Sequence, residues 1–282
     1  MQFSFDDFVY GSFDYDPASQ THTCLWLREE HMDIGGGRIR IEDIDRLREF
    51  PETEVVTISG LRQDTFTYFL RTYGKQLKAI RFFKNKFVED LSLLGTLPQL
   101  EYVYFFANQR VTSLWDMRNN LSLTGLCIED FTRLQSIENI QTAPALRHFF
   151  IGNAVWSTMM LDSLLPLAGT EIAHFSFTGK GIADNDLSFL AEMKQLKTFD
   201  FAPHLYTTEQ VAWIAANFPE LSGRSVGAIA DDYPDTSDVS IVGKRKPYLP
   251  KKNEERIRKY VDAFEALKKT YKGVPYRDAF PH

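Results

Sequence analysis

The chain has 282 residues, 44% of them apolar, which is enough to bury a sizeable core. Its formal net charge of −6 argues against general nucleic-acid binding, and no run of about 18 uncharged apolar residues is present to cross a membrane. The N-terminus lacks a basic, apolar secretion signal, and Cys24 and Cys127 lie about a hundred residues apart. We therefore expect a soluble, cytoplasmic protein with reduced thiols.

Residues 1–53 are expected to form an N-terminal cap. Residues 24–27 are predicted to be a short strand, and the three glycines at 35–37 a turn, because they lack the Lys and Ser/Thr of a phosphate loop. A helix is predicted over residues 41–50, closed by Pro51. Its apolar stripe consists of Ile41, Ile44, Leu47 and Phe50.

An apolar triplet then recurs with a period of roughly 23–26 residues. Its six full copies are Leu77/Ile80/Phe82, Leu100/Val103/Phe105, Leu123/Leu126/Ile128, Leu146/Phe149/Ile151, Ile172/Phe175/Phe177 and Leu196/Phe199/Phe201. A weaker copy at Val55, Ile58 and Gly60 precedes them. Fixed self-similarity at this period predicts stacked units, with parallel strands centred near Ile58, Ile80, Val103, Leu126, Phe149, Phe175 and Phe199.

The triplets resemble the leucine-rich repeat over residues 54–222. That resemblance implies an α/β fold, a right-handed β-α solenoid with a parallel concave sheet and terminal caps. The asparagine that follows the strand in this family is present at Asn85 and Asn108. Asn153 lies one place early, and the remaining units carry Phe131, Ala154, Lys180 and His204 at that position. A divergent, irregular array of bacterial type is therefore expected.

The segment that returns from each strand to the next is predicted to be helical in the later units, at residues 184–193 and 208–214. Residues 223–250 have the composition of a loop or linker, with a final strand at 241–243. Residues 251–282 are expected to form a capping helix and tail, with Asn253 as N-cap. A free helix that binds a partner through its basic face is the alternative.

Side-chain alternation places one set of residues on the concave face, and we predict that they contact a protein partner. Grouped aromatic side chains are typical of such interfaces. The candidate partner-binding residues are Arg81, Phe83, Tyr102, Tyr104, Phe106, Glu129, His148, Phe150, His174 and Asp200. The alternative is that flanking segments fold over the sheet and make these aromatic residues part of the core.

Neither catalysis nor a cofactor or metal is expected. His148, His174 and Cys127 offer too few converging ligands for a transition metal, although the two histidines raise the option of a pH-sensitive surface. The chain lacks the Gly-x-Ser-x-Gly, His-Glu-x-x-His and Cys-x-x-Cys patterns. An enzyme with a site in residues 1–53 or 223–250, and a self-assembling structural module, are the alternatives.

The two ends of the chain have opposite charge. Residues 1–54 contain thirteen acidic residues against five arginines, and residues 244–272 contain eleven basic residues against four acidic ones. Two solvated caps would explain this, and so would an acidic end that meets a basic partner. We therefore expect a non-catalytic protein-binding scaffold, monomeric or weakly oligomeric, of the inhibitor or immunity type in its most specific form.

Overall fold

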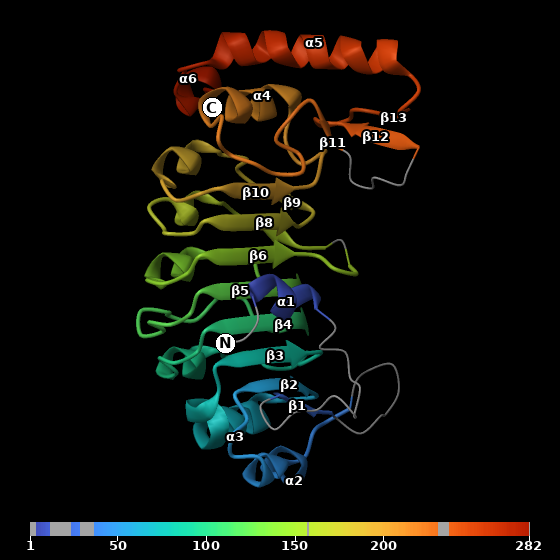
Figure 1. Ribbon diagram of the computed structural model, residues 1–282. Helices are drawn as coiled ribbons and strands as arrows, with labels where there is room; N and C mark the ends of the chain where they lie inside the picture. The colour runs from blue at the N-terminus through green and yellow to red at the C-terminus, as the bar shows by residue number, and fades with distance from the viewer. Residues whose placement is uncertain (1–3, 12–23, 29–36, 157, 231–236, 282) are drawn as a thin grey trace.

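Figure 1 shows a computed structural model of the chain, in which eight parallel strands form one sheet. The structure describes residues 4–11, 24–28, 37–156, 158–230 and 237–281. Strand order in the sheet follows chain order, and the strands are β1 (Cys24–Leu27), β2 (Val55–Ser59), β3 (Ala79–Phe83), β4 (Tyr102–Asn108), β5 (Gly125–Phe131), β6 (His148–Gly152), β8 (His174–Thr178) and β10 (Thr198–Phe201). All of their pairings are parallel. The seven predicted strands and the short strand at 24–27 are confirmed.

The core lies between the sheet and the return segments. The second and third residues of each triplet point inward and are buried. Where phenylalanine occupies these positions, rings from successive strands stack, with centroids 4.8 Å apart for Phe82 and Phe105 and 5.3 Å apart for Phe175 and Phe199. Offset stacks of this kind add to the free energy gained by burying the rings, so the large side chains bind one unit to the next.

Most return segments contain a short 3-10 helix. They include η3 (Gly74–Gln76), η4 (Ser92–Thr96), η5 (Glu138–Thr142), η6 (Leu165–Leu167) and η7 (Ser188–Glu192). The helix predicted over 184–193 is therefore wrong in type and extent. Its apolar residues recur every third position, and a 3-10 helix with three residues per turn keeps such a row on one face better than an α-helix does. The same spacing explains residues 41–50, where α2 (Ile41–Ile44) passes into η2 (Asp45–Glu49).

Two return segments are α-helices, α3 (Gln63–Tyr73) and α4 (Thr208–Asn217). The helix predicted over 208–214 is confirmed, with Thr207 as its N-cap: the Gln210 amide donates to Thr207 Oγ1 at 3.2 Å, and the Thr207 amide donates to Gln210 Oε1 at 3.0 Å. This reciprocal capping box satisfies two amides that lack partners within the helix. Two short strands, β7 (Met160–Leu161) and β9 (Gly181–Ile182), pair separately.

Buried amide side chains close the turns that follow the strands. Asn85 Oδ1 accepts from the Leu61 amide at 2.7 Å, and Asn85 Nδ2 donates to the Ile58 carbonyl at 2.9 Å. Asn108 Nδ2 donates to the Asn85 carbonyl at 2.9 Å. Asn153, although displaced by one position, accepts from the Met159 amide at 3.1 Å. Each side chain satisfies backbone groups that no strand partner reaches.

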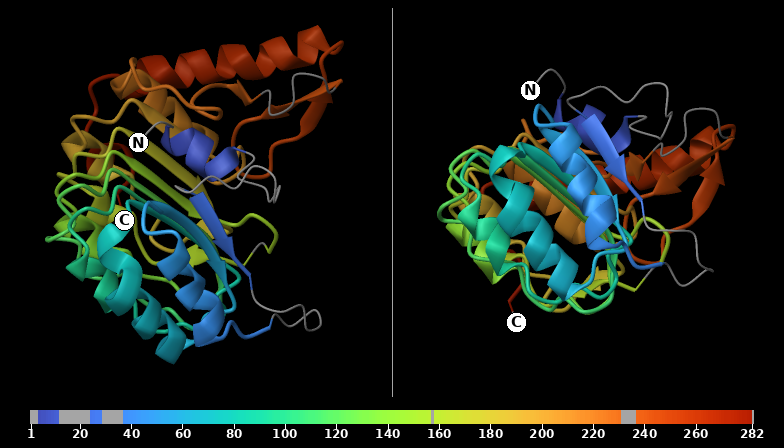
Figure 2. Two further views of the ribbon diagram at one scale, coloured as in Figure 1. Left: turned by 60° about the horizontal axis from the view of Figure 1, so that its bottom comes forward. Right: turned by 90° about the horizontal axis from the view of Figure 1, so that it is seen from below.

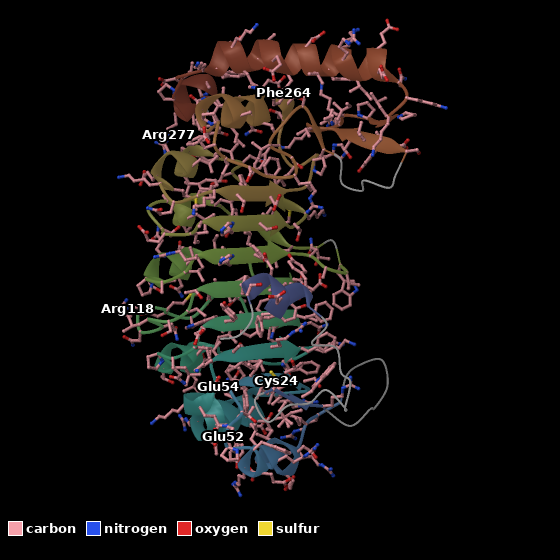
Figure 3. All side chains as sticks on the ribbon, in the orientation of Figure 1. Cys24, Glu52, Glu54, Arg118, Phe264 and Arg277 are labelled. Atoms are coloured by element: carbon pink, nitrogen blue, oxygen red, sulfur yellow. The ribbon has the colours of Figure 1, made fainter. Side chains whose placement is uncertain are left out.

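The C-terminal elements cover the last repeat (Figure 1). The helix α5 (Glu254–Tyr271) lies across α4, and its Phe264 is 2% exposed between them (Figure 3). Asn253 is the N-cap residue of α5, as predicted, but its side chain makes no cap hydrogen bond. The short helix α6 (Tyr276–Ala279) follows. A small antiparallel sheet contains β11 (Ile229–Ala230), β12 (Asp238–Ile241) and β13 (Tyr248–Pro250), so the strand expected at 241–243 lies earlier in the chain.

Candidate protein interface

Figure 2 shows α1 (Phe5–Tyr10) on one face of the sheet and the return segments on the other. We call the first of these the α1 face. Its side chains form three rows across the strands, because the pairing is in register and side chains alternate. The rows are Cys24, Val55, Ala79, Tyr102, Gly125, His148, His174 and Thr198; Trp26, Thr57, Arg81, Tyr104, Cys127, Phe150, Ser176 and Asp200; and Ser59, Phe83, Phe106, Glu129, Gly152 and Thr178. All ten candidate partner-binding residues lie in these rows.

The helix α1 packs on the middle of this face. The Phe5 ring centroid lies 5.3 Å from Tyr102, 5.4 Å from His148 and 5.3 Å from Phe150. The Phe8 ring centroid lies 5.6 Å from Tyr102. Phe5 and Phe8 are three positions apart and therefore lie on one side of the helix, and both are almost completely buried.

Gly125 provides the space that Phe5 occupies. A Cβ atom at Gly125 would lie 2.2 Å from Phe5 Cδ2, far inside van der Waals contact. The glycine is the first residue of β5 and lies between Tyr102 of β4 and His148 of β6. A strand glycine of this kind marks the close approach of another group.

The expectation that Tyr104 faces solvent is wrong. Its ring is 6% exposed and belongs to an apolar cluster with Phe5, Phe8 and Cys127. Tyr102, Phe106 and Phe150 are partly buried at the edge of this cluster. A segment distant in sequence therefore covers the face, which is the alternative that the sequence left open.

The polar groups beneath α1 are coupled to one another. The Tyr104 hydroxyl donates to Glu129 Oε2 at 2.7 Å, and the Arg81 guanidinium lies 4.9 Å from the Tyr104 ring centroid. Burial raises the pKa of the Glu129 carboxyl, and the Tyr104 hydrogen bond opposes that rise. Burial also raises the pKa of the Cys127 thiol, which is 1% exposed. This thiol is therefore unreactive while α1 is in place.

His148 and His174 are neighbours, as expected, with their rings stacked 4.6 Å apart. His174 Nδ1 lies 2.9 Å from Thr198 Oγ1. Burial and the adjacent His174 lower the pKa of His148, while Asp6 of α1 opposes this shift. Among the residues that the structure describes, no group of three or more His, Cys, Asp or Glu side chains converges to hold a metal ion.

A second aromatic feature runs along the carboxyl ends of the strands. Phe83 and Phe106 stack 5.0 Å apart, and Trp156, from the turn after β6, stacks on Phe106 at 6.5 Å. Trp26 meets the other side of Phe83 edge-on at 6.5 Å. We call Trp26, Phe83, Phe106 and Trp156 the aromatic ridge. Trp156 is 44% exposed and the adjacent Val155 is 65% exposed.

A buried carboxylate holds this turn. Asp130 is 1% exposed and accepts hydrogen bonds from the amides of Ala154, Val155 and Trp156 at 2.9–3.1 Å. The sequence analysis did not identify Val155 or Trp156 as candidates. The available signal was that two large apolar residues follow the β6 triplet in positions where the repeat needs none.

Asp200 belongs to the last turn of the array, where its Oδ1 accepts from the Arg224 amide at 2.7 Å. It lies on the α1 face, where it acts electrostatically on Tyr10 of α1. On the opposite side of the molecule, a hollow of about 270 Å³ lies where α4 ends. Its lining is Leu190, Ala191, Met193, Lys194, Leu196, Phe218, Pro219, Glu220 and Leu221, a set that suits apolar contact and contains no nucleophile paired with a base.

No family model matches this chain, and no curated protein matches it. Among solved structures, the chain is similar to an internalin from Listeria monocytogenes, with 18% sequence identity and a TM-score of 0.32. The match covers 62% of this chain and 52% of the internalin chain. In the described part of the chain, no helix is long and apolar enough to cross a membrane.

Proposed function

We propose that this chain is a divergent leucine-rich-repeat protein that works as a non-catalytic scaffold and binds a protein partner through the α1 face and the aromatic ridge at its edge. The repeat assignment is supported by the in-register parallel strands and by the buried Asn85 and Asn108 turns. The α1 face and the aromatic ridge overlap, because Phe83 and Phe106 belong to both.

The observation that carries the proposal is the Val155–Trp156 turn. It presents two large apolar side chains to solvent, and its backbone is fixed by three hydrogen bonds to one buried carboxylate. Burying such a carboxylate costs free energy unless its hydrogen bonds are satisfied, and here they hold an exposed tryptophan in place. A preorganised aromatic anchor loses little conformational entropy when a partner covers it, which is typical of binding hot spots.

Charges beside the ridge favour a particular kind of partner. The Arg28 guanidinium lies 3.9 Å from the Trp26 ring centroid, and Lys84 Nζ lies 5.1 Å from that of Phe83. A partner docked on the ridge would therefore place carboxylates at this rim. The basic partner expected from the acidic first 54 residues, such as a toxin or nuclease, would need a different edge of the molecule.

The test compares two substitutions of exposed apolar residues. Affinity purification with the wild-type chain as bait should enrich a partner that Trp156→Ala loses and Leu121→Ala retains. Leu121 is 67% exposed and precedes β5, on the return side, so it controls for general loss of apolar surface. With the purified partner, Trp156→Ala should weaken binding by about 2 kcal/mol, or roughly 30-fold. Equal binding by both variants would contradict the proposed interface.

A self-assembling module is the competing reading, and light scattering on the same samples separates it from the scaffold. The scaffold predicts a single monomer-sized species without the partner. A large assembly of wild-type chains that Trp156→Ala disperses would assign the ridge to contacts between copies of this chain.

A further inference from the structure

The helix α1 has a capping residue at each end. The Asp7 amide donates to Ser4 Oγ at 3.1 Å, and the Ser4 amide donates to Asp7 Oδ2 at 3.0 Å, so the first turn has a complete capping box. At the other end, the Gly11 amide donates to the Asp7 carbonyl at 2.8 Å. The caps at both ends of α1 are therefore made within residues 4–11.

The surface beneath α1 is a shaped receptor for that unit. Gly125 leaves a gap between Tyr102 and His148, and Phe5 fills it. Phe8 and Val9 belong to the same apolar cluster, whose floor includes Val55, Ala79 and Cys127. The receptor thus selects a helix with one large ring above Gly125 and further apolar side chains three and four positions later.

Charges complete the recognition. Asp6 and Asp7 occupy the first turn of α1, where a carboxylate interacts favourably with the helix dipole. Asp6 acts electrostatically on His148, and the Arg81 guanidinium lies 5.9 Å from the Phe8 ring centroid. A docked helix with acidic residues in its first turn therefore meets a surface with a histidine and an arginine.

The helix α1 docks mainly through apolar side chains. The three buried side chains favour docking, whereas ordering a helix of six residues opposes it, and so short a helix is not stable alone. The free energy of docking is therefore a small difference between these opposing contributions. A segment of the same pattern on another protein, with a larger total interface, would compete with α1 for the receptor.

We infer that α1 is the intrachain occupant of a helix-docking groove, and that a protein partner displaces it with a short helix of the same chemistry. That helix carries aromatic residues three positions apart, an apolar residue beside the second, and a carboxylate in its first turn. The inference rests on the proposed function, since it names what the α1 face recognises, but its test needs neither the partner nor Trp156.

The test presents α1 to the groove as a separate molecule. A fluorescent peptide with the sequence of residues 1–11 is titrated against the full-length chain with Phe5→Ala and Phe8→Ala, which removes both anchors from the intrachain helix. Fluorescence anisotropy should show saturable binding. The wild-type chain should bind at least about tenfold more weakly, because its tethered helix competes at a high effective concentration.

Two controls define the site. A peptide that itself carries Phe5→Ala and Phe8→Ala should not bind. Adding Gly125→Ala to the chain should abolish binding of the intact peptide, because the new methyl group occupies the place of the Phe5 ring. If the double variant melts cooperatively yet binds both peptides equally, or if Gly125→Ala leaves binding unchanged, the groove is not a docking site and the inference is overturned.

Other outcomes are equally informative. If the double variant does not fold, the same titration is run on the Phe5→Ala chain, which keeps Phe8 and Val9 in place. If the wild-type chain is a dimer that becomes monomeric in the double variant, the occupant is α1 of a second copy and the partner inference is overturned. Loss of partner binding by Trp156→Ala together with failure of the peptide would leave the proposed function intact and reject only the groove.

Discussion

The two terminal helices cover the repeat array in different ways. The helix α5 lies across its end and is bound by both apolar and polar groups: Trp213 Nε1 donates to the Val274 carbonyl at 2.7 Å, and Asn217 Nδ2 donates to the Tyr271 carbonyl at 3.0 Å. The helix α1 lies on the face of the sheet and inserts Phe5 and Phe8. The α5 cap is part of the fold, because it satisfies polar groups at the end of the array. The helix α1 is held by inserted side chains and resembles a bound ligand.

Free energies make the same distinction. Burying Phe5, Phe8 and Val9 contributes about 1.5–3 kcal/mol for each side chain. Ordering the six residues of α1 costs about 1–2 kcal/mol for each residue. The two sums are of similar size, so the free energy of α1 docking is a small difference between larger contributions. The 18 residues of α5 are also anchored by Phe264, Tyr276 and the hydrogen bonds to α4.

Deleting residues 251–282 should have the largest effect. The truncated chain exposes Trp213, which is 3% exposed in the whole protein, and removes the Tyr276 hydroxyl that accepts from Gln210 and the Tyr271 carbonyl that accepts from Asn217. We expect a loss of several kcal/mol, equivalent to a fall in Tm of about 10 °C or more, together with aggregation. Circular dichroism melts and light scattering measure both. Unchanged melting would show that the C-terminal helices are an appendage and not a cap.

Tyr104→Ala should have the next largest effect, because the ring lies under α1. Truncation of a buried aromatic ring costs about 3 kcal/mol of unfolding free energy. Tyr104→Phe keeps the ring and removes only the hydrogen bond to Glu129, so it should cost about 1 kcal/mol. Urea titrations of the two variants measure the difference. Wild-type stability for Tyr104→Ala would mean that the ring is exposed in solution and that α1 is not docked.

Gly125→Ala should release α1 and leave the array folded. The backbone of a strand accepts alanine, and the three atoms nearest to the added Cβ all belong to the Phe5 ring. We expect a loss of no more than about 2 kcal/mol, since α1 docking is a small balance of larger contributions. Maleimide labelling of Cys127, located by mass spectrometry, should become at least about tenfold faster as the thiol is uncovered. If Cys127 in Gly125→Ala is labelled at the wild-type rate, Phe5 does not pack over Gly125 in solution.

The pH dependence should be the smallest effect. The pKa of His148 is lowered in the folded state, so the unfolded state binds more protons and stability increases with pH. This contribution is present above the ordinary histidine pKa of about 6.5 and is lost as the pH falls through the lower, folded-state value. Asp6 opposes the shift and His174 supports it. As the pH is lowered from 7.5 to about 5, the Tm should therefore fall less for His148→Gln than for wild type. The control is His204→Gln.

The strands were predictable because their signal is local and repeated. A triplet such as Leu100, Val103 and Phe105 contains both the period of the array and the alternation of the strand, so position and face follow together. Helix type was less predictable. A row of apolar residues spaced by three suits a 3-10 helix, and Leu187, Leu190 and Met193 were assigned to an α-helix instead.

The candidate site was predictable in position but not in exposure. Tyr102, Tyr104 and Phe106 lie where alternation put them. Phe5 docks onto Gly125, a residue 120 positions further along the chain. The first ten residues contain no periodic pattern that would predict this contact. Trp156 was missed for another reason: its turn depends on Asp130, a contact between units that no single repeat shows.

The turn side chains also limit how this gene could lengthen by duplication. The interval from Asn85 to Asn108 is one unit, and inserting another copy of it would recreate every hydrogen bond that links neighbouring turns. The next unit has no such freedom, because Asp130 binds the backbone at residues 154–156 and requires that turn directly after it. New units should therefore be tolerated before β4 and rejected between β5 and β6.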